Sequence, residues 1–333
     1  LGPCWEGLLL DRDTFLDLGR HPEIDHDTFH MTAIAMRMSG TTNGVSRKHG
    51  GVTRRLWNGL WPDRPEDEVP VGHVTNGVHR PTWMSRPIRE VVLPALAGMD
   101  PDDPKSWDSV FGIDDDALWN AHVWVKGRLF DFIRQQARVR WRDHWTQAGH
   151  LAGAGPLLDP NALTIGFARR FASYKRADLI LRNEGRLLRL LTNSKRPVQI
   201  IFSGKAHPAD DVGKQVLQRV FQFARDPRVE GRIAFLEDYE KHLAHRLVEG
   251  VDVWLNMPRV PMEACGTSGM KAALNGVPQL GTLDGWWAEG FTGMNGWMIP
   301  PAEEDEGPEA ADESDWDSLF TLLEDEVVPV FHD

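Results

Sequence analysis

The sequence has very little cysteine and no long apolar run. Its only two cysteines, Cys4 and Cys265, are too few for a disulfide scaffold and favour a reducing compartment, so we expect a cytoplasmic protein. No run of about 18 apolar residues occurs, and residues 1–5 lack the basic and apolar regions of a signal peptide. We therefore expect neither a membrane-spanning helix nor a membrane partner.

Basic residues are absent from the C-terminal stretch. The formal net charge is -12, yet residues 301–333 hold thirteen acids and no Lys or Arg, so the remainder is nearly neutral. No basic stripe of the kind that binds nucleic acid is present, and we expect no nucleic-acid partner. The acidic run Glu303–Glu306 is expected to be a solvated loop. The composition, 41% hydrophobic and 26% charged, is that of a globular protein with a large core.

Two predicted boundaries divide the chain into three regions. Helical patterns cover Thr32–Met38 and Val52–Leu60, and an acidic stretch interrupted by prolines follows at residues 99–104. A long helix starts near Asp114, and residues 149–160, rich in Gly, Ala and Pro, form the best linker candidate. We therefore predict three regions: residues 1–98, the end of one domain; residues 99–160, a helical connector and linker; and residues 161–333, most of a second domain.

Beyond residue 160 the pattern alternates between strands and helices. The predicted strands are Leu163–Phe167, Val198–Ser203, Ile233–Leu236 and Val251–Leu255. The predicted helices run from about Lys175 to Leu191, through Val212 and Phe221, and up to about Val248. Such alternation predicts an α/β fold with a mostly parallel, doubly wound sheet. In these folds ligands bind beyond the carboxyl ends of the strands.

A glycine-rich turn leads to Lys271. After the predicted strand ending near Leu255, residues 266–275 form a predicted helix that Gly276 and Pro278 end. Free N–H groups and the Thr267 hydroxyl at the helix start would meet a phosphate, with Lys271 one turn further on. An ordinary loop with a solvated lysine fits this segment equally well, because the P-loop spacing is absent.

Four cations follow the first predicted strand: Arg169, Arg170, Lys175 and Arg176. By composition alone they would form a solvated basic face. Their place at a strand end, where ligand crevices form, instead favours anion binding, for which the planar Arg guanidinium is well suited.

Five ordered motifs resemble those of the α-glucan (glycogen/maltodextrin) phosphorylases. They are Gly166–Arg176, Phe202–Pro208, Glu237–Tyr239, Glu263–Lys271 and Gly281–Gly285. Upstream, Asn43–Gly50 and His73–Trp83 resemble the shorter bacterial and archaeal branch. The resemblance covers nearly the whole chain and implies two Rossmann-like domains of the GT-B glycosyltransferase type, the first only partly present. Because family members are longer at both ends, we expect this chain to be a fragment.

The resemblance also implies the chemistry. Family members cleave α-1,4-glucans with inorganic phosphate and release α-D-glucose 1-phosphate, whereas most glycosidases use two carboxylates. They use pyridoxal 5′-phosphate, which would be attached to Lys271 and whose phosphate relays a proton to the substrate phosphate. The implied partners are an α-glucan and inorganic phosphate, and the full-length protein is expected to be a homo-oligomer.

Site residues are implied by matching motif positions. The matches assign the substrate phosphate to Arg170 and Lys175, and the cofactor phosphate to Arg169. The remaining cofactor-binding positions are Gly266, Thr267, Ser268, Tyr239 and Lys271 itself. The substrate-binding positions are His79, Tyr174, Glu263, Cys265 and the Gly266 amide. The implied catalytic set is Arg170, Lys175, Lys271 and His79.

Other residue patterns carry weaker expectations. His242 and His245 are three residues apart without a third ligand, so we expect no metal site. Most of the fourteen tryptophans are expected to fill cores, with Trp286 and Trp287 the best candidates for stacking on sugars.

Two alternatives to a phosphorylase remain open. A nucleotide-sugar glucan synthase of the same architecture would need no pyridoxal, and a non-catalytic glucan-binding fragment would have no activity at all. We expect the isolated 333-residue chain to have little phosphorolytic activity, because the family's N-terminal region supplies part of the cofactor pocket and glucan groove.

Overall fold

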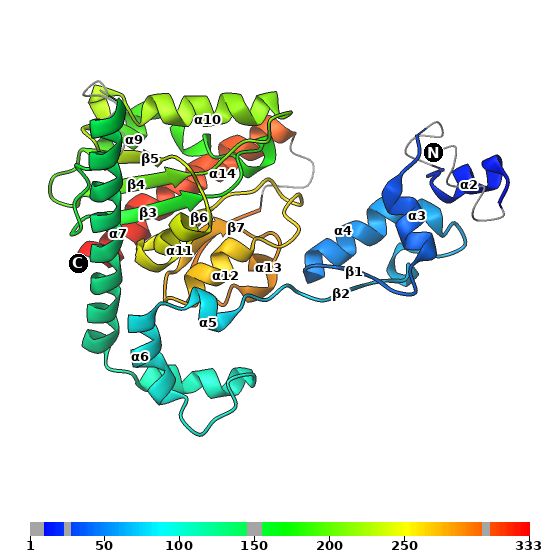
Figure 1. Ribbon diagram of the computed structural model, residues 1–333, viewed down its shortest axis with the longest axis horizontal. Coiled ribbons are helices and arrows are strands. Elements are labelled where there is room, and N and C mark those ends of the chain that lie inside the picture. Colours follow the sequence, from blue (N-terminus) through cyan, green and yellow to red (C-terminus); the bar gives the residue numbers. More distant parts are fainter. Residues whose placement is uncertain (1–9, 23–27, 145–154, 302–306) are drawn as a thin grey trace. The chain divides into compact units, whose positions relative to one another are not determined.

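A computed structural model of the chain describes residues 10–22, 28–144, 155–301 and 307–333. The chain forms two compact units (Figure 1). The small unit comprises the described residues up to Asn76 together with Glu263–Cys265 and Asp284–Glu289. The large unit comprises Gly77–Met262, Gly266–Leu283 and Gly290–Asp333, described where the ranges above allow. The predicted divisions at residues 98 and 160 stay predictions.

The small unit contains two short parallel strands and several helices. Strand β1 (Thr42–Gly44) pairs with β2 (Val71–His73), and the helices are α2 (Arg12–Leu18), α3 (Met31–Met38) and α4 (Arg47–Trp57). Single 3₁₀ turns follow at Asn58–Leu60 and Glu66–Glu68. The helices predicted near Thr32 and Val52 are confirmed. Helix α4 begins earlier than predicted because Ser46 caps it, its hydroxyl accepting from the His49 N–H at 3.0 Å.

A six-stranded parallel sheet organises the large unit. Its strands are β3 (Leu163–Ala168), β4 (Val198–Ser203), β5 (Ile233–Leu236), β6 (Val253–Asn256), β7 (Gln279–Thr282) and β8 (Gly296–Ile299). They are ordered β5-β4-β3-β6-β7-β8, and every ladder is parallel. This is the strand order of a Rossmann sheet. The predicted α/β class and the four predicted strands are confirmed, whereas β7 and β8 were not predicted.

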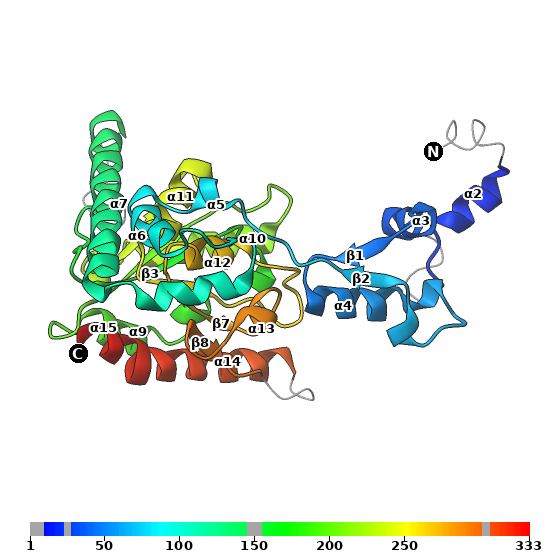
Figure 2. The same cartoon turned by 90° about the horizontal axis from the view of Figure 1, so that it is seen from below.

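Helices cover both faces of this sheet. On one face lie α9 (Glu184–Leu191), α10 (Asp211–Phe223), α14 (Pro308–Leu322) and α15 (Val328–His332), with a π-helical turn at Leu323–Val327 before α15. On the other lie α7 (Asp115–His144), α11 (Lys241–Gly250) and α12 (Thr267–Ala273). Figure 2 shows α11 and α14 on opposite sides of the strands. The long helix predicted to start near Asp114 is α7.

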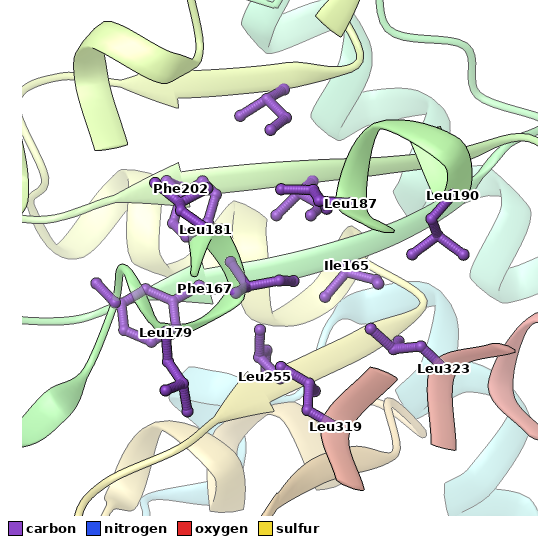
Figure 3. Close-up of a cluster of buried hydrophobic side chains, with 14 of the residues drawn as sticks. Ile165, Phe167, Leu179, Leu181, Leu187, Leu190, Phe202, Leu255, Leu319 and Leu323 are labelled. Atoms are coloured by element: carbon purple, nitrogen blue, oxygen red, sulfur yellow. The ribbon is translucent and has the colours of Figure 1, made fainter. Parts of the chain in front are cut away.

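Alternating strand residues build the two cores, because successive side chains of a strand point to opposite faces. Ile165, Phe167, Phe202 and Leu255 pack against Leu187, Leu190, Leu319 and Leu323 in one cluster, shown in Figure 3. Ile201, Ala234 and Trp254 face the other cluster, with Leu129 and Leu247 from the helices. Burial on both faces explains the nearly continuous apolar composition of these strands.

Short elements complete the large unit. The chain enters it through α5 (Arg80–Trp83) and α6 (Arg86–Ala95), and a 3₁₀ segment at Pro104–Gly112 precedes α7. Helix α13 (Trp287–Gly290) lies at the boundary between the units in sequence. Among the described residues, no helix is both long and apolar enough to cross a membrane.

The helix predicted from Lys175 to Leu191 is wrong over its first half. Two 3₁₀ turns, Ser173–Lys175 and Leu179–Leu181, occupy that stretch, and only α9 is a true helix. The physical reason lies at Arg176, whose φ of 50° is left-handed and incompatible with helix continuation. Asn183 then caps the N-terminus of α9, where its side-chain oxygen accepts a hydrogen bond from the Arg186 N–H at 2.9 Å.

Two predicted loops fall largely outside the described residues. Residues 149–154 of the predicted linker and the acidic run 303–306 are not described. In the described part of the linker, Gly155 and Leu158 are buried, whereas Leu157 is exposed. A Cβ at Gly155 would lie 2.9 Å from the Ile133 side chain of α7.

Candidate active site

The carboxyl ends of the strands meet at one edge of the sheet. Ala168, Ser203 and Leu236 are in register as the last residues of β3, β4 and β5. The strand order reverses between β3 and β6, which is where ligands bind in such sheets. At this point the Arg169 guanidinium donates to the Asn256 side-chain oxygen, joining the residue after β3 to the last residue of β6.

The Phe202–Pro208 motif packs against the loop that follows β3. The Arg169 N–H donates to the Ser203 carbonyl at 3.1 Å, and the Phe171 N–H donates to the Lys205 carbonyl at 2.9 Å. A Cβ at Gly204 would lie 2.1 Å from the Arg169 carbonyl oxygen, so only glycine fits. Two motifs separated in sequence therefore form one rigid loop pair at the sheet edge.

The four cations after β3 do not form a solvated face. Arg169, Lys175 and Arg176 are 9%, 6% and 4% exposed, and only Arg170 is exposed. Burial of three cations requires compensating acceptors or anions. Lys175 also lies 4.4 Å from the centre of the Tyr174 ring, a cation–π contact.

Arg176 has a structural role. Its Nε donates to the Met257 carbonyl at 2.9 Å, and its terminal nitrogens bind Asp312 at 2.9 Å and Asp315 at 2.6 Å. All three guanidinium nitrogens of Arg176 are therefore bound to acceptors of the chain. Arg169, Arg170 and Lys175 therefore remain as the candidate anion ligands of this segment.

Tyr239 lies beside Arg169. Its hydroxyl donates to the Ala168 carbonyl at 3.2 Å, which places it at the end of β3. Burial raises the pKa of Tyr239, and the nearby Arg169 charge opposes that rise. The structure thus brings together two residues that the sequence assigned to one ligand.

Lys271 lies on the short helix α12. This helix starts at Thr267 after Gly266, whose φ of 86° is left-handed and favours glycine. The Ser268 hydroxyl accepts from the Trp254 indole N–H at 3.3 Å, which ties the first turn to β6. Burial, followed by the charge of Lys241, lowers the pKa of Lys271. The amine is therefore more easily neutralised than an ordinary lysine.

Trp83 is a site residue that the sequence analysis did not assign. The Lys271 Nζ lies 3.8 Å from the centre of the Trp83 ring. Its only sequence signal was its place in the His73–Trp83 motif. The contact joins the chain segment before α6 to the lysine helix.

Asn275 fixes this segment to α12. Its side-chain amide donates to the Trp83 carbonyl at 2.8 Å and to the Lys271 carbonyl at 2.9 Å, while its oxygen accepts from the Ser85 N–H at 2.7 Å. Asn275 is 1% exposed, so these bonds are shielded from water. No role was assigned to Asn275 from the sequence.

His79 lies at the start of α5. It is exposed, and its Nδ1 lies 2.7 Å from the Thr82 hydroxyl oxygen. This contact closes the first turn of the short helix. His79 is thus four residues from Trp83 on the same segment.

Glu263 and Cys265 belong to the small unit. Glu263 is buried, and its backbone N–H donates to the buried Asp284 carboxylate at 2.8 Å. Cys265 is 4% exposed, and burial raises the pKa of its thiol. A buried thiol with a raised pKa is a poor nucleophile, in keeping with a packing role.

The two tryptophans proposed to stack on sugars differ in exposure. Trp287 is 1% exposed and therefore fills a core, so the expectation for this residue is wrong. Trp286 is partly exposed, with its ring 5.2 Å from that of Trp287.

No metal centre is found in the part of the chain that the structure describes. No group of three or more His, Cys, Asp or Glu side chains there is arranged to hold an ion. The His242 ring lies edge-on to the Phe132 ring, with ring centres 5.4 Å apart, and His245 is hydrogen-bonded to the Thr82 carbonyl oxygen.

Comparison with known proteins gives consistent matches. A family model described as carbohydrate phosphorylase matches residues 15–289. A glycogen phosphorylase of Aquifex aeolicus is 44% identical over 327 residues, which is 97% of this chain and 46% of that protein. A maltodextrin phosphorylase of Thermococcus litoralis is 42% identical, over 97% of this chain and 38% of that protein. A glycogen phosphorylase of Mycobacterium tuberculosis is 43% identical, over 97% and 37%. The chain thus spans less than half the length of these relatives.

Proposed function

Because this chain belongs to the carbohydrate phosphorylase family, we propose that it supplies the cofactor and phosphate site of an α-1,4-glucan phosphorylase. The reaction would convert glycogen or maltodextrin and inorganic phosphate into α-D-glucose 1-phosphate. One observation carries the proposal: Lys271, a half-buried lysine with a lowered pKa, lies on α12, whose first turn is bound to β6, the strand that Arg169 also binds through Asn256.

The residues around Lys271 fit pyridoxal 5′-phosphate. Attachment to an aldehyde requires a neutral amine, and burial lowers the pKa of Lys271 in that direction. Trp83 offers an aromatic wall for a planar ring, at 3.8 Å from the amine. Helix α12 has only seven residues, so its macrodipole is weak and local N–H groups at Gly266, Thr267 and Ser268 would hold the phosphate. When bound, the cofactor phosphate supplies an acid–base group for the substrate phosphate.

The cations after β3 would hold the two phosphates. Arg169, anchored on Asn256 beside Tyr239, would face the cofactor phosphate. Exposed Arg170 and buried Lys175 would bind the substrate phosphate. Two phosphates placed close together repel each other, and preorganised cations in a partly dry site offset that repulsion.

The glucan would be bound by a second set of residues, which shares Gly266 with the cofactor site. We assign the glucosyl unit to Glu263, Cys265 and the Gly266 amide, which are close in sequence, together with Tyr174 and His79. A buried carboxylate such as Glu263 suits sugar hydroxyls, which are strong hydrogen-bond donors. Cytoplasmic location and homo-oligomer formation by the full-length protein belong to the same proposal.

Cofactor attachment tests this assignment. The chain is incubated with pyridoxal 5′-phosphate, reduced with borohydride, digested and mapped by mass spectrometry. We expect one pyridoxyl group on Lys271, lost in Lys271→Ala and kept in Lys214→Ala, a lysine on α10 paired with Asp211. A Lys271→Ala protein that keeps a stoichiometric cofactor at another lysine would contradict the assignment.

Activity is tested in a chimera. The matching segment of the Aquifex aeolicus relative is replaced by this chain, since the two are 44% identical. We expect release of glucose 1-phosphate from maltodextrin and phosphate, reduced by about 10²-fold or more in Arg170→Ala or Lys175→Ala. A folded, cofactor-loaded chimera without glucose 1-phosphate release would overturn the proposed function.

A further inference from the structure

His245 on α11 is bound on both ring nitrogens by hydrogen-bond acceptors. Its Nε2 lies 2.5 Å from the Thr82 carbonyl oxygen, and its Nδ1 lies 2.8 Å from a Glu249 carboxylate oxygen. A carbonyl and an ionised carboxylate only accept, so each ring nitrogen must carry a proton. With Glu249 ionised, the two contacts fit an imidazolium, which donates from both ring nitrogens.

His245 also packs on the tryptophan that contacts Lys271. The His245 and Trp83 rings are stacked, with centres 5.6 Å apart and planes 30° apart. Lys271 lies 3.8 Å from the Trp83 ring centre. Because Thr82 directly precedes Trp83, the bond from His245 to the Thr82 carbonyl fixes the backbone that carries the indole. Besides the charge of Lys241, helix α11 thus acts on Lys271 through the Trp83 side chain.

The charges around His245 favour its protonated form. The Glu249 hydrogen bond is the largest influence and raises the pKa of His245, while burial and the Arg246 charge oppose it. His245 lines a cavity of about 1290 Å³, to which three helices contribute charged groups. These are Arg86 and Glu90 of α6, Arg128 of α7, and Lys241, Arg246 and Glu249 of α11, with Glu240 just before it. Arg86 and Glu90 are paired at 2.7 Å and largely offset each other.

We propose that His245 is a positioning residue: its imidazolium, held between Glu249 and the Thr82 carbonyl, keeps the Trp83 ring against Lys271 and limits access to the Lys271 amine. Above the raised pKa the ring keeps one N–H for two acceptors, so its bond to the Thr82 carbonyl weakens, Trp83 loosens and Lys271 becomes more accessible. The identification of Lys271 as the cofactor lysine rests on the proposed function. The contacts of His245 and Lys271 with Trp83 do not depend on it.

Chemical labelling of Lys271 tests the proposal. The cofactor-free 333-residue chain is treated with an amine-acylating reagent between about pH 6 and 9, and the Lys271 peptide is quantified by mass spectrometry. His245→Ala should label about 5- to 10-fold faster than the parent at the acidic end, the factor expected for one lost hydrogen bond. The ratio should approach 1 as the pH passes the raised pKa of His245, and taking the ratio removes the pH dependence of labelling that the two proteins share.

Three further variants keep the test decisive. His245→Gln retains a donor for the Thr82 carbonyl and should restore much of the protection without titrating. Glu249→Gln should move the loss of protection to lower pH, and an NMR titration of the His245 imidazole should shift the same way. His242→Ala, three residues earlier on α11, is the matched control and should label as the parent does.

The outcomes separate this proposal from the proposed function. A folded His245→Ala protein whose Lys271 labels at the parental rate at every pH would overturn the positioning role. Changed labelling in a chain that never accepts pyridoxal 5′-phosphate on Lys271 would support the positioning role and refute the cofactor assignment. If Glu249→Gln leaves the pKa of the His245 imidazole in the NMR titration unchanged, this would also count against the proposal.

Discussion

At the residue scale, burial and partners separate side chains that look alike in sequence. Arg169, Arg170, Lys175 and Arg176 stand within eight positions, yet Arg176 is bound by Asp312 and Asp315, and Arg170 is exposed. Sequence spacing could not distinguish them, because the acids that bind Arg176 lie more than 130 positions away. The adjacent cations therefore have different consequences when removed.

Arg176→Ala should destabilise the fold strongly. It would leave buried Asp315, whose pKa burial already raises, without its counter-charge. Removing one partner of a buried pair costs about 3–5 kcal/mol, whereas exposed Arg170→Ala should change stability by less than about 0.5 kcal/mol. Urea unfolding of the two variants measures both values. Equal midpoints for the two would show that the Arg176 pairs contribute nothing.

Cys265 should react slowly with alkylating reagents. Its pKa is raised by burial, so near pH 8 less thiolate is present than for an ordinary cysteine. As pH increases the thiolate fraction should rise later in the folded protein than in the unfolded chain. Iodoacetamide labelling with and without denaturant, followed by peptide mapping, measures the difference. Equal rates would mean that the thiol is accessible and unperturbed.

At the element scale, strong hydrophobic patterns predicted four of the six strands of the large sheet. The two strands with weak apolar patterns were not predicted. Strands β3 to β6 are apolar runs buried on both faces, and all four were predicted. Strands β7 and β8 are four residues each, and include Gln279, Gly281 and Gly296, so their apolar signal is weak. Trp83 ends the short helix α5, and Asn275 and His245 hold this helix end through the carbonyls of Trp83 and Thr82.

Asn275→Ala should release that segment from α12. The change leaves the Ser85 N–H and the Trp83 and Lys271 carbonyls without their buried partner, at a cost of about 1–3 kcal/mol for each group that water does not reach. Both the free energy of unfolding and the affinity for pyridoxal 5′-phosphate should fall.

Two variants control this experiment. Asn275→Asp keeps an acceptor for Ser85 but places a carboxylate against two carbonyl oxygens, so it should not restore stability. Exposed Asn193→Ala, which removes only local turn bonds, should be close to the parent. An Asn275→Ala protein with parental stability would mean that these bonds do not hold the segment.

At the scale of the whole molecule, the acidic C-terminal region is held against the rest of the large unit by two kinds of contact. Exposed or partly exposed pairs join it to basic residues, such as Arg186 with Glu324 at 2.9 Å and Arg196 with Asp333 at 2.5 Å. Apolar side chains, including fully buried Leu319 and Phe320, pack into the sheet core. The acidic composition is therefore partly neutralised by cations from earlier in the chain.

Apolar burial should matter more than the exposed pairs. Raising NaCl to about 0.5 M screens surface pairs, each worth about 0–1 kcal/mol, and should lower stability only slightly. Leu319→Ala should cost about 2–5 kcal/mol at either salt concentration, because it leaves a cavity. Thermal and urea unfolding at both salt concentrations compare the two. A large salt effect with a small Leu319→Ala effect would reverse this ranking.

The sequence by itself determined the alternation of apolar strands and amphipathic helices, and hence the parallel α/β sheet, because these patterns depend on near neighbours in the chain. It also placed the glycine turn before Lys271 and the cations after β3. Only the tertiary structure decided that Arg176 is structural, that Trp83 covers Lys271, and that Asn275 and His245 hold Trp83 in place. Those contacts join residues far apart in sequence, and their strength depends on burial that no local pattern encodes.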